Sequence, residues 1–349
     1  MRLTNIYNYP QWYVDMVSGF LYDPTDGGRR RSDCSATRSI NPLQQIVLTR
    51  RYGDSVAVDV SDMTWIILGQ AAHSACYHAQ TRSINRLKRA AKLAGEPEPE
   101  DLPALEDRLY VPIVTKHGVF TYSGQPDRIC FDHTVRDLKV TSAWKLVFDK
   151  EHREWQRQLS IYNAMGYAYG LPVVDKGQIC AILKDWQKSK AEDSPDYPQA
   201  NVQFLDFELA SPDTTFKWLQ QRAEEIADAM ELGDDELPPC TAEEIWAKDE
   251  KWAVYKDEKS KQAMRGGVCD TQEQAEAKLE AIKADCPGAY VEHRPGRHIR
   301  CDFDPDLWAK HGIVSPGYCK IAPFCKQHQE YLAEQGLEVP EPAEPVLVS

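Results

Sequence analysis

The feature that most constrains the fold is a set of four short β-prone segments between residues 108 and 141, lying between two stretches with helical periodicity. The segments span 108–115, 119–123, 128–131 and 136–141, and turn-forming residues separate them. Such spacing predicts an antiparallel meander. Apolar residues recur at helical spacing over 65–92 before these strands and over 155–169 after them, where Gly170 is suited to end the helix.

Further elements lie on both sides of this central part. A short helix is predicted over 42–52, and Asp59 and Ser61 are suitable N-caps for the helix that follows. Residues 178–186 and 202–209 are typical of strands, 187–199 of a polar loop, and 214–232 of an amphipathic helix. The order helix, strands, helix, strands predicts an α/β fold with a mixed central β-sheet flanked by helices.

The domain organisation follows from shifts in composition. We expect an irregular N-terminal segment (1–34), a core domain (35–232) and, beyond the acidic stretch 233–239 with its two final prolines, a C-terminal part (240–330). That part combines a small α+β insertion, with strands at 252–255 and 289–293 around a helix at 271–284, and a cysteine-containing segment. The Pro- and Glu-rich residues 331–349 are predicted to be a disordered tail, and 95–105 a surface loop.

Composition restricts the classes of function. The formal net charge of −13 argues against a protein that coats nucleic acid through clustered cations, but it is compatible with a nuclease whose carboxylates hold metal ions. No window approaches the roughly 18 apolar residues of a membrane span, and residues 1–11 lack the features of a signal peptide. We therefore expect a cytoplasmic protein with reduced cysteines and no membrane contact. Basic residues that could gather on one face are Arg29, Arg30, Arg31, Arg50, Arg51, Arg82, Arg86, Lys88 and Arg89.

The central constellation is Asp127, at the end of a Gly-Gln-Pro-Asp run, followed after nine residues by Asp137-Leu-Lys139. Side chains alternate along a strand, so Asp137 and Lys139 project from one face, while the turn before Asp127 can bring its carboxylate alongside. Two carboxylates suit Mg²⁺, and a nearby lysine can orient a metal-bound water. The trio predicts a metal-dependent hydrolytic site with these three residues as its catalytic groups.

Three residues on the flanking helices extend the constellation. His73 interrupts an apolar stretch, where histidine is usually a core residue but is also a common metal ligand. Gln158 and Tyr162 are one helical turn apart and share a face with Trp155. An amide and an aromatic ring on one face can contact a sugar-phosphate strand and stack a base, whereas Trp155 suits a hydrophobic core equally well.

The motifs Gly69-x-x-x-His73, Gly-Gln-Pro-Asp127, Asp137-Leu-Lys139 and Gln158-x-x-x-Tyr162, in this order, resemble the motif series of the RecB-like branch of the PD-(D/E)XK nuclease superfamily. That branch includes CRISPR-associated exonucleases and many phage-encoded nucleases, and the resemblance covers about residues 35–232. It implies a restriction-endonuclease-like core. By the resemblance, the ligands of Mg²⁺ or Mn²⁺ would be His73, Asp127, Asp137 and the backbone carbonyl of Val140; Lys139 would position the attacking water; and Gln158 and Tyr162 would engage DNA.

The activity implied is hydrolysis of phosphodiester bonds in DNA. We expect an exonuclease acting on DNA ends or single strands in phage or prokaryotic recombination, replication or degradation, located in the host cytoplasm if phage-encoded. The alternatives are an endonuclease of the same superfamily, or an inactive module that binds DNA or a partner. A protein partner in a recombination or replication complex is a further expectation. The motifs carry no information on cleavage polarity, strand preference, the number of metal ions or the oligomeric state.

The chain has ten cysteines, and three of them near the C-terminus, Cys301, Cys319 and Cys325, suggest a second cofactor. Iron–sulfur members of the branch that the chain resembles carry one cysteine near the N-terminus and three near the C-terminus, the last two separated by five residues, as Cys319 and Cys325 are. Cys34 would supply the fourth thiolate. Pro316 departs from this pattern, because those members have cysteine there. The candidates are a [4Fe-4S] cluster or Zn²⁺, against unligated thiols.

Overall fold

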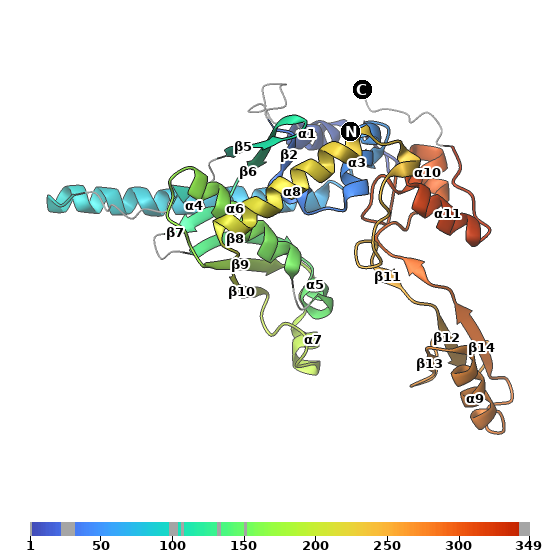
Figure 1. Cartoon of the computed structure of the whole chain (residues 1–349). Coiled ribbons are helices and arrows are strands. Elements are labelled where there is room, and N and C mark those ends of the chain that lie inside the picture. The colour runs from blue at the N-terminus through green and yellow to red at the C-terminus, as the bar shows by residue number, and fades with distance from the viewer. Residues whose placement is uncertain are drawn as a thin grey trace. The chain divides into compact units, whose positions relative to one another are not determined.

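The computed structural model describes residues 2–21, 32–97, 104–105, 108–130, 134–149 and 152–341. The chain forms two compact units, which are considered separately (Figure 1). The sheet unit comprises chiefly Leu3–Val47 and Val58–Leu232, and the C-terminal unit comprises Met1–Arg2, Leu48–Ala57 and Gly233–Leu347. The division at Leu232 falls where the sequence changes to its acidic, proline-containing stretch.

The sheet unit is built on a five-stranded mixed sheet in the order β10-β9-β8-β7-β4. Strands β8 and β9 are parallel, and the other neighbours are antiparallel. A second sheet has the order β2-β6-β5, with β2 parallel to β6. The strands are β2 (Cys34–Ser35), β4 (Ala104–Leu105), β5 (Leu109–Thr115), β6 (Gly118–Gly124), β7 (Arg128–Cys130), β8 (Thr134–Thr141), β9 (Lys176–Leu183) and β10 (Val202–Glu208). The predicted mixed α/β fold is thereby confirmed.

The prediction of one antiparallel meander was wrong in one respect. β5 and β6 form one hairpin and β7 and β8 another, but the two hairpins lie in different sheets. The chain changes sheet after Gly124, where it runs against helix α6 (Arg153–Ala168). A Cβ atom on Gly124 would lie 2.7 Å from the sulfur of Met165 and 3.2 Å from the ring of Tyr162, so a larger residue here would require the Met165 side chain to move.

Helix α6 is the centre of the packing in the sheet unit. It contacts β8, β9 and β5, and α8 (Pro212–Glu231) packs against α6 and β5. Fully buried Leu159, Ile161 and Met165 of α6 share a core with Ile179 of β9 and Leu219 of α8. The remaining helices of this part are α2 (Ala36–Ser39), α3 (Leu43–Tyr52), α4 (Thr64–Ala94), α5 (Ala143–Phe148) and α7 (Lys188–Asp193).

The N-terminal segment is more regular than its sequence predicts. It contains β1 (Arg2–Thr4) and helix α1 (Gln11–Leu21), and later β3 (Ala57–Asp59) pairs with β1. Val14 and Val17 of α1 are buried in a small cluster with Val58, Val60 and Met63. The prediction of an irregular segment over 1–34 is corrected to this extent, because these valines supply an apolar face that the local pattern did not reveal. Residues 22–31 lie outside the described part.

Two further local predictions change. Helix α4 has Met63 rather than Asp59 or Ser61 at its N-cap position, because the carboxylate of Asp59 accepts hydrogen bonds from the backbone N–H groups of Ile6 at 2.8 Å and Ser61 at 2.9 Å. The predicted polar loop 187–199 contains the short helix α7. By contrast, α3, α6, α8, β9 and β10 lie where the sequence predicts them, within a few residues at each end.

The C-terminal unit contains the expected strand, helix, strand insertion. Strands β12 (Lys251–Tyr255), β13 (Val268–Cys269) and β14 (Tyr290–Arg294) form an antiparallel sheet on which α9 (Gln272–Ile282) packs. The antiparallel pair β11 (Ala247–Lys248) and β15 (Arg297–His298) forms the base of this insertion. Helices α10 (Pro305–His311) and α11 (Lys326–Glu334) follow. Residues 331–334, predicted to be disordered, are therefore helical, and 342–349 lie outside the described part.

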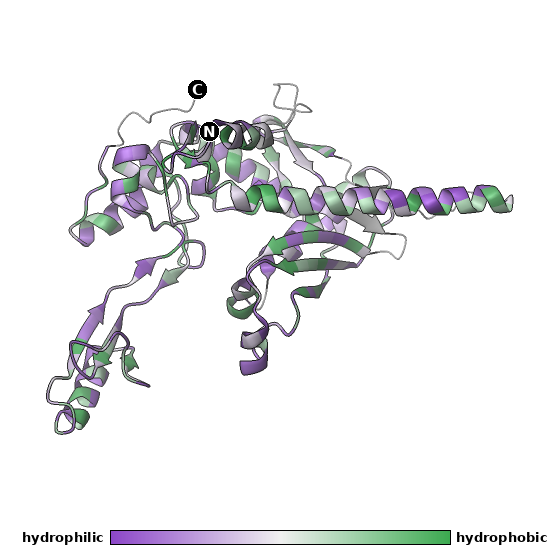
Figure 2. Ribbon diagram, turned by 180° about the vertical axis from the view of Figure 1, so that it is seen from behind, coloured by the Kyte–Doolittle hydropathy of each residue, from purple (hydrophilic) through white to green (hydrophobic). Residues whose placement is uncertain are grey.

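Helix α4 is the longest helix in the described part of the chain, with 31 residues. Hydrophobic and hydrophilic residues both occur along its length (Figure 2). Within the described ranges, no helix combines the length and apolarity needed to cross a lipid bilayer.

Candidate active site

Strand β8 carries the predicted catalytic residues on one face. Val135 is fully buried, Asp137 is 4% exposed, and Lys139 follows on the same side, as strand alternation requires. The opposite face carries Arg136, which donates a hydrogen bond to Gln178 of β9. Helix α6 covers this face at Asp137, whose side chain is 3% exposed, and leaves the Lys139 side chain 24% exposed.

Asp127 is held next to β8 by the backbone. Its Oδ2 accepts a hydrogen bond from the N–H of Leu138 at 2.7 Å. The N–H and C=O groups of one strand residue point to the same side, and residues two apart point alike. The carbonyl of Val140 therefore points to the same side of β8 as the Asp127 carboxylate, away from the β9 ladder, where a metal ligand is expected.

His73 reaches Asp127 from helix α4. Its Nδ1 lies 3.2 Å from Oδ1 of Asp127, and its side chain is 34% exposed. The hydrogen bond with Asp127 raises the pKa of His73, partly opposed by burial. An ion bound by both His73 and Asp127 would take the place of this hydrogen bond, because Nε2 points to the side of the ring away from Asp127.

Asp137 is the most buried acidic group of this site. Its Oδ2 lies 2.6 Å from Nζ of Lys139, and its side chain is only 3% exposed. Burial raises the pKa of Asp137 and the nearby Asp127 carboxylate adds to the rise, while Lys139 and His73 oppose it. A buried carboxylate whose pKa remains raised beside one lysine is stabilised in its ionised form by further positive charge, so the electrostatics favour a bound cation.

Gln158 and Tyr162 lie behind Asp137, on helix α6. Nε2 of Gln158 donates to the hydroxyl of Tyr162 at 2.9 Å and lies 3.5 Å from Oδ1 of Asp137. Both side chains are buried, with 6% and 5% exposure. In this conformation the Tyr162 ring has no open face on which a base could stack, and the pair contacts Asp137 instead. Trp155 is also buried and stacks on His152, which agrees with the alternative prediction that it belongs to the hydrophobic core.

The donor atoms are of the kind that Mg²⁺ and Mn²⁺ prefer: carboxylate oxygens, a backbone carbonyl and one imidazole. Each carboxylate oxygen that already accepts one hydrogen bond keeps a second lone pair. Among the residues that the structure describes, however, no three His, Cys, Asp or Glu side chains stand in the arrangement of metal ligands. The donors fit a hard cation by their chemistry.

An aromatic surface follows strand β8 and was missed by the sequence analysis. Trp144 and Phe148 of helix α5 are 39% and 79% exposed, and their rings stack with centroids 5.6 Å apart. Nζ of Lys190 lies 4.8 Å from the Trp144 ring centroid. The carboxylate of Asp185 fixes the start of α5 by accepting from Ser142 Oγ and Ala143 N. The spacing of Trp144 and Phe148, one helical turn apart after Ser142, was the signal available in the sequence.

The basic residues expected to gather on one face are divided between elements. Arg82, Arg86 and Arg89 are exposed on α4 at a spacing that places them on one side of the helix, about half a turn from His73. Arg51 forms an ion pair with Asp234 inside the C-terminal unit. The residues 29–31 lie outside the described part of the chain.

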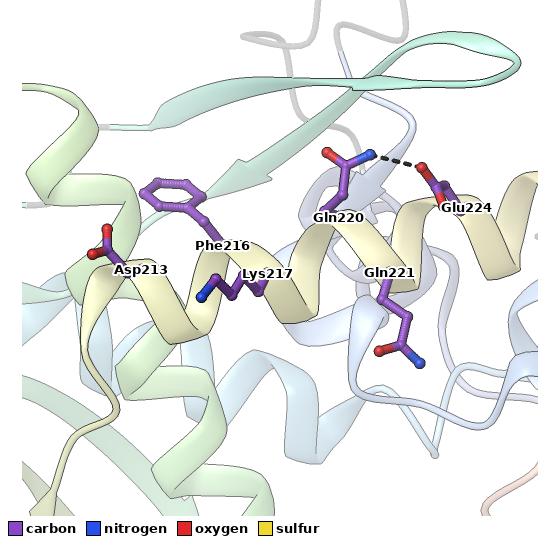
Figure 3. Close-up of a pocket in the computed structure, with 6 residues that line it drawn as sticks. All are labelled: Asp213, Phe216, Lys217, Gln220, Gln221 and Glu224. Carbon is purple, nitrogen blue, oxygen red and sulfur yellow. Dashed lines mark hydrogen bonds between the residues drawn. The ribbon is translucent and has the colours of Figure 1, made fainter.

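A surface hollow of the sheet unit lies on helix α8 and is distinct from the candidate site (Figure 3). Its lining contains none of the predicted site residues. Gln220 in this hollow donates hydrogen bonds to Glu224 at 2.9 Å and to the carbonyl of Val114 at 2.7 Å. The lining residues are Asp213, Phe216, Lys217, Gln220, Gln221 and Glu224.

The predicted cysteine ligands fall in both units. Cys34 is 2% exposed in the hydrophobic core of the sheet unit. Cys301, Cys319 and Cys325 are buried in the C-terminal unit, where Cys240 interacts electrostatically with all three. Cys240 is therefore a neighbour that the sequence analysis did not select.

No protein-family model matches the chain, and no curated protein matches it. Among solved structures, the chain is similar to the crystal structure of SSO0001, with 14% sequence identity and a TM-score of 0.38. The alignment covers 61% of this chain and 84% of that one. A likeness at this level assigns no activity to the chain.

Proposed function

We propose that the sheet unit is a divalent-metal-dependent DNA nuclease whose active site is formed by Asp127, Asp137 and Lys139 with His73. The observation that supports this most strongly is the convergence on β8. A helix, a turn and a strand bring an imidazole, two carboxylates and a lysine together, with one carboxylate almost fully buried. Burying an ionised carboxylate costs free energy unless positive charge or hydrogen bonds compensate it. Such groups are concentrated at functional sites.

In the proposed site, Asp127, Asp137, the carbonyl of Val140 and an imidazole nitrogen of His73 would hold Mg²⁺ or Mn²⁺, and the ion would replace the present hydrogen bond between His73 and Asp127. When bound, the ion would lower the pKa of a water molecule and neutralise the charge that builds up on the phosphate. Lys139 donates from Nζ to the attacking water and orients it toward phosphorus. Its ion pair with Asp137 fixes the position of Nζ, and Gln158 and Tyr162 fix Asp137 from the other side.

The proposed contact with DNA includes the exposed rings of Trp144 and Phe148. Aromatic faces stack unpaired bases without sequence preference, and Lys190 adds a cation for the backbone. Helix α5 begins directly after β8, so this surface and the catalytic residues belong to one continuous stretch of chain. Single strands or frayed ends are the substrates that such a surface favours.

The test uses end-labelled single-stranded and double-stranded linear DNA and closed circular DNA, each with Mg²⁺, Mn²⁺ or EDTA. Asp137→Asn is the matched variant, because it keeps the size of the side chain and removes its charge. Metal-dependent loss of linear DNA alone, absent in the variant, is the expected result. Cleavage of closed circles would assign an endonuclease, and binding without cleavage under every condition would replace the proposal with an inactive DNA-binding module.

A further inference from the structure

We propose that the C-terminal half of helix α4 is a binding surface for the phosphate backbone of double-stranded DNA, separate from the candidate active site. Its contact residues, called the cationic row, are the exposed side chains of Arg82, Arg86, Arg89 and Lys92. The inference rests on the proposed function, because it names a part of the DNA substrate that is bound away from the cleaved bond. It is tested by binding alone, so that it can fail independently of the nuclease proposal.

The charge of α4 differs from that of the chain as a whole. The chain has 54 acidic and 41 basic residues, which give a formal net charge of −13. Helix α4 has 31 residues, and none of them is Asp or Glu. All its Lys and Arg residues lie between Arg82 and Lys92. A segment with this charge in an otherwise acidic protein attracts an anionic partner.

The spacing of the cations matches a row of phosphates. Arg82, Arg86 and Arg89 follow one another at four and three residues, which places them on one side of the helix, and Lys92 continues the row. At a rise of about 1.5 Å per residue, the cationic row extends for about 15 Å along the helix axis. Duplex DNA carries about nine phosphate charges over that length.

The usual structural reasons for surface cations do not account for this row. Cations stabilise the last turn of a helix, which contains only Lys92. Within the described ranges, no carboxylate forms an ion pair with any member of the cationic row. Arg82 and Arg86 are four residues apart, so their like charges repel and destabilise the helix. Bound phosphates would compensate this repulsion.

The residue types favour the backbone of a duplex over unpaired bases. Three of the four cations are arginines, whose planar guanidinium groups bind phosphate oxygens through paired hydrogen bonds. The stretch 79–94 contains no aromatic residue on which a base could stack. The exposed rings of Trp144 and Phe148 on α5 provide such a surface. The two helices therefore suit different parts of a DNA substrate, the duplex and the single strand.

The cationic row faces away from the active site. Arg82 follows His73 by nine residues, which is about 14 Å along the axis and about half a turn around it. His73 is directed toward Asp127, so the row lies on the opposite side of α4. DNA bound there would not cover the catalytic residues. The expected role is therefore to hold the substrate, with an effect on affinity and not on the rate of the chemical step.

The first test measures binding of a labelled blunt-ended duplex to the full chain by fluorescence anisotropy, with EDTA present, at several salt concentrations. Wild type is compared with the triple variant Arg82→Gln, Arg86→Gln and Arg89→Gln. Loss of three phosphate contacts should reduce the slope of log affinity against log salt concentration by about 2.7. Between about 50 and 200 mM salt, the wild type should thus lose about 40-fold more affinity than the variant.

A second triple variant is the control for the change in net charge. Arg38→Gln, Lys176→Gln and Lys217→Gln remove the same charge from exposed positions on α2, β9 and α8 of the same unit. This variant should keep the wild-type slope. Equal slopes for wild type and the α4 variant, or equal reductions in both variants, would overturn the inference. So would an α4 variant that loses binding to a single-stranded oligonucleotide but not to the duplex.

A measurement on wild-type protein covers the case in which the α4 variant loses its helix. Lysine acylation is followed by mass spectrometry with and without the duplex. The duplex should protect Lys92, while Lys176 and Lys217 stay reactive. Equal reactivity of Lys92 in both samples would contradict binding at this surface and would leave an acidic protein as the partner to test.

The binding and cleavage results separate the two proposals. Duplex binding that depends on the cationic row, without cleavage under any condition, would contradict the nuclease proposal and support this inference. Metal-dependent cleavage, together with wild-type duplex binding by the α4 variant, would overturn this inference alone.

Discussion

The two candidate sites of this chain differ in the elements that carry them. The acidic site of the sheet unit lies on the central strand β8, the turn before β7 and the helices α4 and α6. Its residues are close in sequence or recur at the spacing of a strand or a helix. The cysteine cluster of the C-terminal unit lies on turns and helix ends that are far apart in the sequence. A site on regular elements can be predicted from periodicity, whereas a site made by loops requires the tertiary structure. The sites also differ in donor chemistry, since oxygen and imidazole suit Mg²⁺ and sulfur suits zinc or iron.

The largest expected effect is a loss of DNA cleavage that involves only the acidic site of the sheet unit. Asp137→Asn should lower the rate of DNA cleavage at least about 1000-fold, equivalent to about 4 kcal/mol. The melting temperature should stay equal or rise, because the variant removes a buried charge whose pKa burial raises. Cleavage kinetics and thermal unfolding measure both effects. Asp206→Asn, an exposed carboxylate on β10 of the same sheet, is the control and should change neither.

The next effect concerns only the stability of the C-terminal unit. Burial lowers the pKa of His328 to about 4, and the side chain is 2% exposed, so the folded state binds this proton less readily than the unfolded state, whose value is near 6.5. The contribution of His328 to the free energy of unfolding is fully present above about pH 6.5. It falls as the pH decreases toward 4, by at most about 3 kcal/mol. Denaturant unfolding at pH 7 and pH 5 measures it.

His328→Leu should reduce that loss of stability between pH 7 and pH 5. His293→Gln, at an exposed histidine paired with Glu250, should leave it unchanged. The same acid sensitivity in wild type and His328→Leu would show that another group titrates.

Lys139→Met should lower the cleavage rate about 100-fold, the lower range for loss of a positioned proton-transfer group. Because it leaves Asp137 without its closest cation, this variant should also be less stable than Asp137→Asn. Single-turnover cleavage with saturating metal measures the first effect. Lys176→Met, at an exposed lysine of β9, is the control. A Lys139→Met protein with the wild-type rate would exclude a direct role for this amine.

The smallest effect tests the proposed DNA surface. Trp144→Ala should weaken binding of a single-stranded oligonucleotide about 10-fold, because one stacked base contributes roughly 1–3 kcal/mol. Fluorescence anisotropy with metal replaced by EDTA separates binding from cleavage. Phe204→Ala removes an aromatic ring of β10 that is 63% exposed, more than Trp144 at 39%, and should have no effect. Equal losses in both variants would indicate a general surface effect rather than a binding surface.

Much of the acidic site could be predicted because strand alternation has a fixed period. Asp137 and Lys139 share a face for that reason alone, and the Pro126-Asp127 turn brings the second carboxylate alongside, as the bond to Leu138 N shows. The prediction for Tyr162 differs from the structure because periodicity gives the face of a helix but not whether that face is covered. Here β8 and Gly124 cover it.

The cysteine cluster could be predicted only in part. The spacing of Cys319 and Cys325 is local and is visible in the sequence. The position of Cys240 near this pair depends on its long-range hydrogen bonds with Gln327, which the sequence does not reveal. Cys34 was selected by position along the chain, and its burial among the side chains of β5 and β6 had no local signal. The separation of the two hairpins into different sheets was missed for the same reason, because pairing of β6 with β2 depends on a distant segment.

The most direct measurement of the central claim is a Mg²⁺ titration of the cleavage of single-stranded linear DNA by wild-type protein and by Asp137→Asn, prepared and freed of metal in parallel. We predict that cleavage by the wild type rises with Mg²⁺ to a plateau and returns to background with EDTA, while the folded variant stays at background throughout. Cleavage by Asp137→Asn at the wild-type rate, or wild-type cleavage that EDTA does not affect, would contradict the account.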